Sequence, residues 1–254
     1  PKIKVDLHKM TEGRQDATIM VAYLEQKERT DEALLAATAK ADRLLNEIEE
    51  MVAMNCTAVD IAYSPNDLYR LKREGKKAIM LGIENGYAIG KDLSRVAHFR
   101  KRGVVYMTLC HNGNNDICGS ARYNEENLGV TPFGEQVIQE MNRLGMMVDL
   151  SHSGERTFYE TLDISSQPVV CSHSSSRALC NHPRNLTDDQ LRAIARKGGV
   201  VQVCLYSGFL RKERPAHILD AIEHLNHMVN VMGIEHVGIG SDFDGDGGII
   251  GCND

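Results

Sequence analysis

Seven short, mostly apolar runs alternate with longer amphipathic segments, and this alternation constrains the fold more than any other feature of the chain. Nearly continuous apolar runs are typical of parallel strands that are covered on both faces. The amphipathic segments between them supply the crossover helices that parallel strands need. The predicted strands span residues 17–23, 78–84, 104–110, 146–151, 168–172, 199–205 and 236–241.

Helical periodicity is clearest in two segments. One begins at the capping pair Thr30 and Asp31 and carries an apolar stripe as far as Met51. The other is opened by Pro215, carries its stripe to Met232 and is closed by Gly233. Shorter helices are predicted after Pro65, Leu93, Pro132, Ser153 and Thr187.

This order of elements predicts an α/β fold of the (β/α)8 TIM-barrel type, with a doubly wound open sheet as the alternative. No GxGxxG or Walker motif favours a nucleotide-binding version, and no linker divides the chain, so residues 1–254 are predicted to form one domain. A closed barrel needs eight strands and a helix after the last one. We therefore expect a partial barrel that lacks its first strand and its last helix, within a longer protein.

Composition and charge exclude several classes of protein. A net charge of −6 and an isoelectric point near 5.9 argue against nucleic-acid binding, which requires a basic face. The apolar runs are too short to cross a bilayer, so no transmembrane segment is predicted. Seven cysteines at irregular spacings form no CxxC pair, which favours a reducing compartment such as the cytoplasm. Location in the periplasm or attachment to a membrane is the alternative to a cytoplasmic location.

Five of the predicted strands end in a polar residue able to bind a metal. In a parallel barrel these ends meet on one face, where barrel enzymes carry out their chemistry. Each residue alone is more simply explained by a hydrogen bond to a loop. Five together favour a site for zinc or a similar divalent ion. The five are Glu84, His111, His152, His173 and Asp242.

A metal-activated water is the nucleophile that these residues favour, because no GxSxG or similar nucleophile motif is present. Asp242 is the candidate for moving the proton. Ser172 and the serines at 174–176 are predicted to form a polar loop that satisfies backbone groups. Asp149, inside a predicted strand, is expected to pair with a group behind the first shell of ligands.

Three motifs now resemble a known family. They are VDLSH at 148–152, SHSSSRALCNHPRN at 172–185 and VGIGSDFDG at 237–245, and all three are similar to the membrane (renal) dipeptidase family of zinc peptidases. The resemblance covers essentially the whole chain. It implies two zinc ions, with Glu84 as the carboxylate that bridges them and His152 and His173 as ligands of the second. A hydroxide between the two metals would attack the peptide bond.

The resemblance also implies how a dipeptide is held. His111 would contact the substrate near the scissile carbonyl and steady its negative charge. Arg184, in HPRN, would bind the terminal carboxylate with its planar fork of donors. Asp242 would take and return the proton, and in some accounts of the family it also faces the substrate's amino group. Members of the family form homodimers, which implies the same here.

One departure from the family pattern concerns the first metal. The family needs a His-x-Asp pair at the end of the first strand, and none of the ten histidines here has an aspartate two residues later. We expect the pair to lie upstream of Pro1. Two alternatives stay open: another amidohydrolase-type barrel hydrolase (a deaminase, lactonase or cyclic amidase), or a non-catalytic binding relative that lacks the first metal site.

Overall fold

The computed structural model describes residues 3–254, so Pro1 and Lys2 of the predicted domain lie outside the described residues. Within that range the backbone forms one sheet in which all the neighbouring strands are parallel. Its strands are β1 (Ala17–Tyr23), β2 (Val59–Ile61), β3 (Lys77–Glu84), β4 (Val104–Thr108), β5 (Met147–Asp149), β6 (Val170–Cys171), β7 (Val200–Cys204) and β8 (Val237–Gly240).

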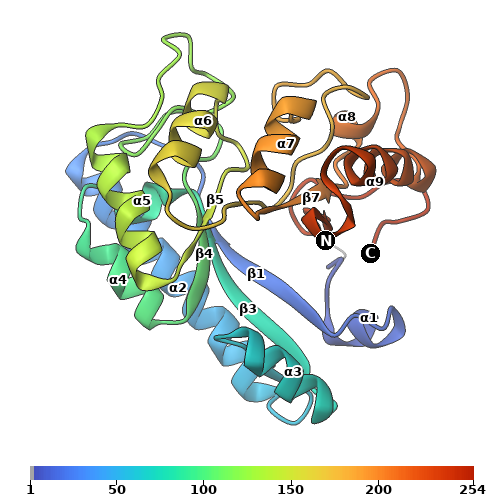
Figure 1. Cartoon of the computed structure of the whole chain (residues 1–254). Coiled ribbons are helices and arrows are strands. Elements are labelled where there is room, and N and C mark those ends of the chain that lie inside the picture. Colours follow the sequence, from blue (N-terminus) through green and yellow to red (C-terminus); the bar gives the residue numbers. More distant parts are fainter. Residues whose placement is uncertain (1–2) are drawn as a thin grey trace.

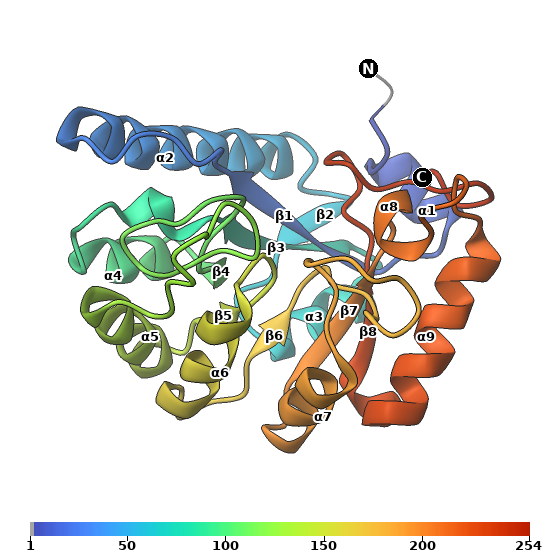
Figure 2. The same ribbon diagram turned by 90° about the horizontal axis from the view of Figure 1, so that it is seen from above.

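The sheet follows the strand order of a barrel. Its path runs β1-β3-β4-β5-β6-β7-β8, with β2 paired to the start of β3, and among the described residues β1 and β8 do not pair with each other. Figure 2 shows the strands curving while the longer helices follow one another around the outside. The predicted (β/α)8 barrel type is confirmed in this open, incomplete form.

All seven predicted strands are present, and one strand was missed. Its short sequence, Val59 to Ile61, carries too few residues for a periodic pattern, although Val59 and Ile61 are buried. The strand gains its partner only when β3 lies beside it, where Val59 aligns with Lys77. A three-residue strand of this kind is therefore specified by tertiary pairing.

All seven predicted helices form, and side chains cap most of them; the helices Ser94–Lys101 and Glu155–Ile164 begin without a side-chain cap. Thr30, Thr131 and Thr187 each accept a hydrogen bond from a backbone N–H in the first turn of the helix that follows. These helices are α2 (Asp31–Met54), α3 (Pro65–Arg73), α4 (Ser94–Lys101), α5 (Pro132–Leu144), α6 (Glu155–Ile164), α7 (Asp188–Arg196) and α9 (Ile218–Met232).

One predicted helix start was wrong, and several short elements were missed. The last long helix begins at Ile218 rather than at Pro215, because the His217 imidazole accepts from Leu219 N while Asp220 accepts from His217 N. The missed elements are α1 (Leu7–Glu12), α8 (Ser207–Leu210) and the 3-10 turns η1 (Gly86–Ile89) and η2 (Ile234–His236).

The core lies between the sheet and its helices. Ile79, Leu81 and Ile83 on β3 are fully buried, as are Phe99 of α4 and Phe158 of α6. Burial of this continuous apolar surface is the main force that holds the helices on the sheet. Figure 1 shows the helices packed along the outer side of the strands. None of the helices in the described part of the chain is long and apolar enough to cross a membrane.

Candidate active site

The carboxyl ends of the parallel strands bring four predicted residues together. Glu84 is the last residue of β3, and His111, His152 and His173 follow β4, β5 and β6 within three residues. The Nε2 atoms of His152, His173 and His111 lie 3.2, 3.6 and 3.8 Å from Oε1 of Glu84. Three imidazoles therefore surround one carboxylate oxygen.

The imidazoles also contact one another. Nε2 of His152 and Nε2 of His173 are 2.8 Å apart, and the ring centroids of His111 and His152 are 4.2 Å apart. His152 reaches this position from a turn in which its φ is +71°, an uncommon conformation for a residue with a side chain. The Tyr23 ring at the end of β1 lies edge-on against His111, with a centroid separation of 4.9 Å.

Burial sets the charge state of this cluster. Desolvation, with the field of Asp242 next, raises the pKa of Glu84 to about 8. Desolvation followed by the field of the Arg184 guanidinium lowers the pKa of His111 to about 4 and that of His152 and His173 well below the ordinary value. Near neutral pH the imidazoles are therefore uncharged and Glu84 mainly carries its proton, so the cluster holds no charged pair of its own.

The donor set fits a divalent metal. His173 Nδ1 lies 2.8 Å from Ser172 Oγ, and His152 Nδ1 lies 3.3 Å from Asn112 Oδ1, so the opposite nitrogens face Glu84. Lone pairs from neutral imidazoles beside a carboxylate are the ligands that zinc prefers. Glu84, His111 and His152 have ligand atoms within 4.8 Å of one another, so this group contains Glu84 and His152 of the predicted metal set together with the predicted substrate contact His111, and His173 is not part of it.

Arg184 is buried beside the cluster without a full set of partners. Its side chain donates to the His173 carbonyl at 3.3 Å and lies over the Phe209 ring at 5.3 Å. No described residue accepts a hydrogen bond from its Nε. The loop that carries Arg184 is held in place by Asn185, which accepts a hydrogen bond from Ser175 N and donates to the carbonyls of Cys180 and Phe209. A buried guanidinium with a free donor is suited to an anion.

Asp242 follows β8 in a tight loop. Its φ is +57°, and its backbone carbonyl accepts from the N–H groups of Gly245 and Gly247 at 3.2 and 2.7 Å. A Cβ on Gly247 would lie 2.0 Å from the Ser241 carbonyl oxygen, so this turn needs glycine. Burial, partly offset by Arg184, raises the pKa of Asp242 to about 6. A carboxyl group with this pKa can exchange a proton near neutral pH.

Three residues contact the cluster although sequence reasoning gave them no part in holding it: Tyr23 was overlooked, and Asn112 was placed only in a polar loop that could contact substrate. Tyr23 and Asn112 touch His111 and His152, and Ser172 contacts an imidazole nitrogen rather than only satisfying backbone groups. An aromatic residue at a strand end and an asparagine or serine in a loop are too common to be recognised in a single sequence.

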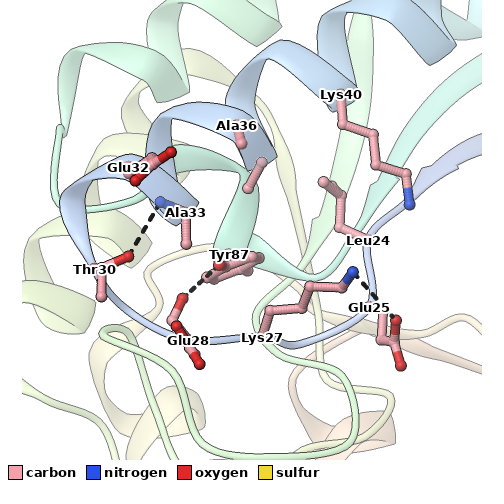
Figure 3. A pocket seen from close by; sticks show the side chains of 11 residues that line it. Leu24, Glu25, Lys27, Glu28, Thr30, Glu32, Ala33, Ala36, Lys40 and Tyr87 are labelled. Carbon is pink, nitrogen blue, oxygen red and sulfur yellow. Dashed lines mark hydrogen bonds and ion pairs between the residues drawn. The ribbon is translucent and has the colours of Figure 1, made fainter.

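A pocket lies beside the start of α2, apart from the imidazoles (Figure 3). Its volume is about 400 Å³, and Glu25 and Lys27 on its rim form an ion pair of 3.9 Å. Tyr23 stands between the two sites, since its ring contacts His111 on one side and Lys40 of the pocket on the other. No metal-site residue lines this pocket.

Comparison with known proteins identifies the family. Residues 1–254 match the family described as membrane dipeptidase, peptidase family M19. The chain belongs to the membrane dipeptidase family. A Schizosaccharomyces pombe relative, described as an uncharacterized dipeptidase, is 44% identical over 68% of this chain and 43% of its own length. Dipeptidase tcpJ of Claviceps purpurea is 32% identical over 95% of this chain and 58% of its own length.

A solved structure agrees with the membrane dipeptidase assignment. The probable dipeptidase PvdM from Pseudomonas aeruginosa superposes with a TM-score of 0.94 at 26% sequence identity, over 100% of this chain and 80% of that one. The chain thus spans roughly half the length of the two curated relatives. All of it superposes on part of the longer PvdM chain.

Proposed function

We propose that the complete protein is a zinc-dependent dipeptidase, which hydrolyses dipeptides that have a free amino end and a free carboxyl end. One observation carries the proposal: Glu84 and the imidazole nitrogens converge at the strand ends beside Arg184, whose Nε has no partner among the described residues. A metal-ligand set next to a buried anion receptor matches a short substrate with a terminal carboxylate.

The chain's own residues divide the work. Zn²⁺, two ions in the complete site, would be held by Glu84, His152 and His173 and would supply a Lewis acid and an activated water. Arg184 binds the substrate carboxylate. His111, uncharged because its pKa is lowered to about 4, donates a hydrogen bond to the carbonyl oxygen as negative charge develops there. Asp242 accepts a proton and returns it to the leaving amine.

The test combines metal content with a substrate panel. Purified full-length protein, loaded with zinc, is expected to contain about two ions per chain and to hydrolyse dipeptides. N-blocked dipeptides, amidated dipeptides and simple lactones should be poor substrates. Lactone or cyclic-amide turnover without dipeptide turnover would overturn the dipeptidase proposal in favour of another amidohydrolase-type activity.

A non-catalytic binding relative is the second candidate, because no His-x-Asp pair occurs in this sequence. One zinc ion or none per full-length chain, together with dipeptide binding but no turnover, would favour it. The position of the pair upstream of Pro1 and the assembly into homodimers, both implied by the resemblance, stay predictions.

Zinc affinity is expected to rise with pH up to about pH 8. Burial raises the pKa of metal-free Glu84 to about 8, so below that pH a cation must displace its proton. The affinity should grow by up to about tenfold per pH unit between pH 6 and 8 and then level off. Calorimetric titration in buffers of different ionisation enthalpy counts the released protons. Binding without proton release at pH 7 would contradict this linkage.

A further inference from the structure

A fully buried carboxylate lies behind the metal-ligand cluster and is not explained by the proposed chemistry. Asp149, the last residue of β5, has no solvent exposure. Its Oδ1 accepts from the N–H groups of Ser151 and Ser172 at 3.0 and 2.9 Å. Its Oδ2 accepts from the hydroxyls of Thr108 and Ser172, both at 2.6 Å. Four donors therefore fill the acceptor sites of one carboxylate.

The Ser172 hydroxyl connects this carboxylate to a metal-ligand candidate. Its single proton is committed to Asp149 Oδ2, so the oxygen is left to accept hydrogen bonds. Two further atoms lie within reach, Nδ1 of His173 at 2.8 Å and Ser151 Oγ at 3.4 Å, and the imidazole nitrogen is the closer of the two. His173 must then carry its proton on Nδ1, which leaves the lone pair on Nε2, 3.6 Å from Glu84 Oε1.

The backbone of His173 is held by the same strand end. His173 N donates to Ser151 Oγ at 2.9 Å, while Ser151 N donates to Asp149. Both the position and the tautomer of the imidazole thus depend on one buried carboxylate. His152 has a weaker arrangement, in which Nδ1 faces the neutral Asn112 amide at 3.3 Å.

We propose that Asp149 is a positioning residue that acts through Ser172, holding His173 as the Nδ1-protonated tautomer with Nε2 directed at the metal. This rests on the proposed function for the metal, whereas the tautomer belongs to the protein alone. Partners of this kind orient a ligating imidazole and strengthen it as a donor.

Asp149→Asn is the decisive variant. Its oxygen can still accept from the two backbone N–H groups, so the strand ends stay joined. Its NH2 group donates where Oδ2 accepted, so the Ser172 hydroxyl turns its proton toward Nδ1 of His173 and the proton of the ring moves to Nε2. We expect zinc affinity to fall about 10- to 100-fold. Ser172→Ala, which removes the hydroxyl, should weaken zinc binding similarly. Ser172→Thr, which keeps a hydroxyl at this position, should bind zinc as the wild type does.

Thr108→Val is the matched control. It removes the Thr108 hydroxyl, which is the second hydroxyl donor to Asp149 Oδ2, but it leaves the Ser172 hydroxyl between Asp149 and His173 in place. It should lower the melting temperature and leave zinc affinity unchanged. Two readouts serve all variants of the full-length protein: calorimetric titration with Zn²⁺ and nitrogen-15 NMR of the metal-free imidazoles.

The outcomes separate this proposal from the proposed function. A purely structural Asp149 predicts that Asp149→Asn and Thr108→Val reduce stability alike and leave the His173 tautomer unchanged, and this result would overturn the proposal. If the wild-type protein binds no zinc, the metal centre is wrong, and the NMR assignment of His173 still decides whether Asp149 fixes its tautomer.

Discussion

Glu84→Gln is expected to abolish zinc binding and to reduce kcat/KM for dipeptides by about 10³-fold or more. The carboxylate oxygen is the atom on which the three imidazole nitrogens converge, and an amide is a much weaker ligand. Loss of several kcal/mol of charge stabilisation by a metal corresponds to about 10³-fold or more in rate. Elemental analysis and steady-state kinetics measure the two effects.

The same variant should be more stable than the wild type when both are free of metal. The folded-state pKa of Glu84, about 8, lies above its unfolded value, so keeping this carboxyl ionised at pH 8 or above opposes folding. Gln removes that cost. Thermal unfolding of metal-free protein at pH 8 is the measurement, and exposed Glu50→Gln on α2 is the control for an ordinary change of charge. Full metal content and turnover in Glu84→Gln would show that Glu84 is not a ligand.

Arg184→Met is expected to lower kcat/KM for a free dipeptide by about 30- to 1,000-fold, chiefly through KM. The guanidinium is 4% exposed and its Nε has no partner among the described residues, so a substrate carboxylate can supply one. Losing such a buried, charge-assisted contact costs about 2–4 kcal/mol. Arg184→Lys keeps the positive charge but loses the planar fork of donors, so its kcat/KM should lie between that of the wild type and that of Arg184→Met.

The amidated form of the same dipeptide makes this test specific. The wild-type enzyme should have a higher kcat/KM for the free dipeptide than for its amide. Arg184→Met should lose this preference, because its kcat/KM for the amide should stay close to the wild-type value. Arg177→Lys is the matched control, since Arg177 lies in the same segment but donates to the Asn185 and Pro183 carbonyls. An equal loss on both substrates in Arg184→Met would indicate a structural role instead.

Much of the candidate site was visible in the sequence because strand ends are local features. An apolar run that stops at Glu84, or that leads into His111, shows both the strand and the residue that its end presents. Parallel pairing then requires those ends to share one edge. The helix at Thr187 was equally predictable, because its capping box lies within four residues.

Features that depend on distant contacts could not be predicted in this way. The start of α9 at Ile218 is a separate case, because its capping residues His217 and Asp220 are local, but histidine is not among the preferred N-cap residues and Pro215 gave the more familiar signal. Strand β2 exists only through its partner β3. Propensity is a weak guide where such a partner decides the conformation.

The sequence by itself determined seven of the strands, the seven longer helices and the residue types at the candidate site, because hydrophobic period and caps act over a few positions. Only the tertiary structure decided the state of those residues. The direction of the Ser172 proton depends on Asp149, 23 positions away, and the raised pKa of Glu84 depends on burial among β3, β4 and β5. Hydrogen-bond direction and desolvation are set by neighbours in space, so they exist only in the folded chain.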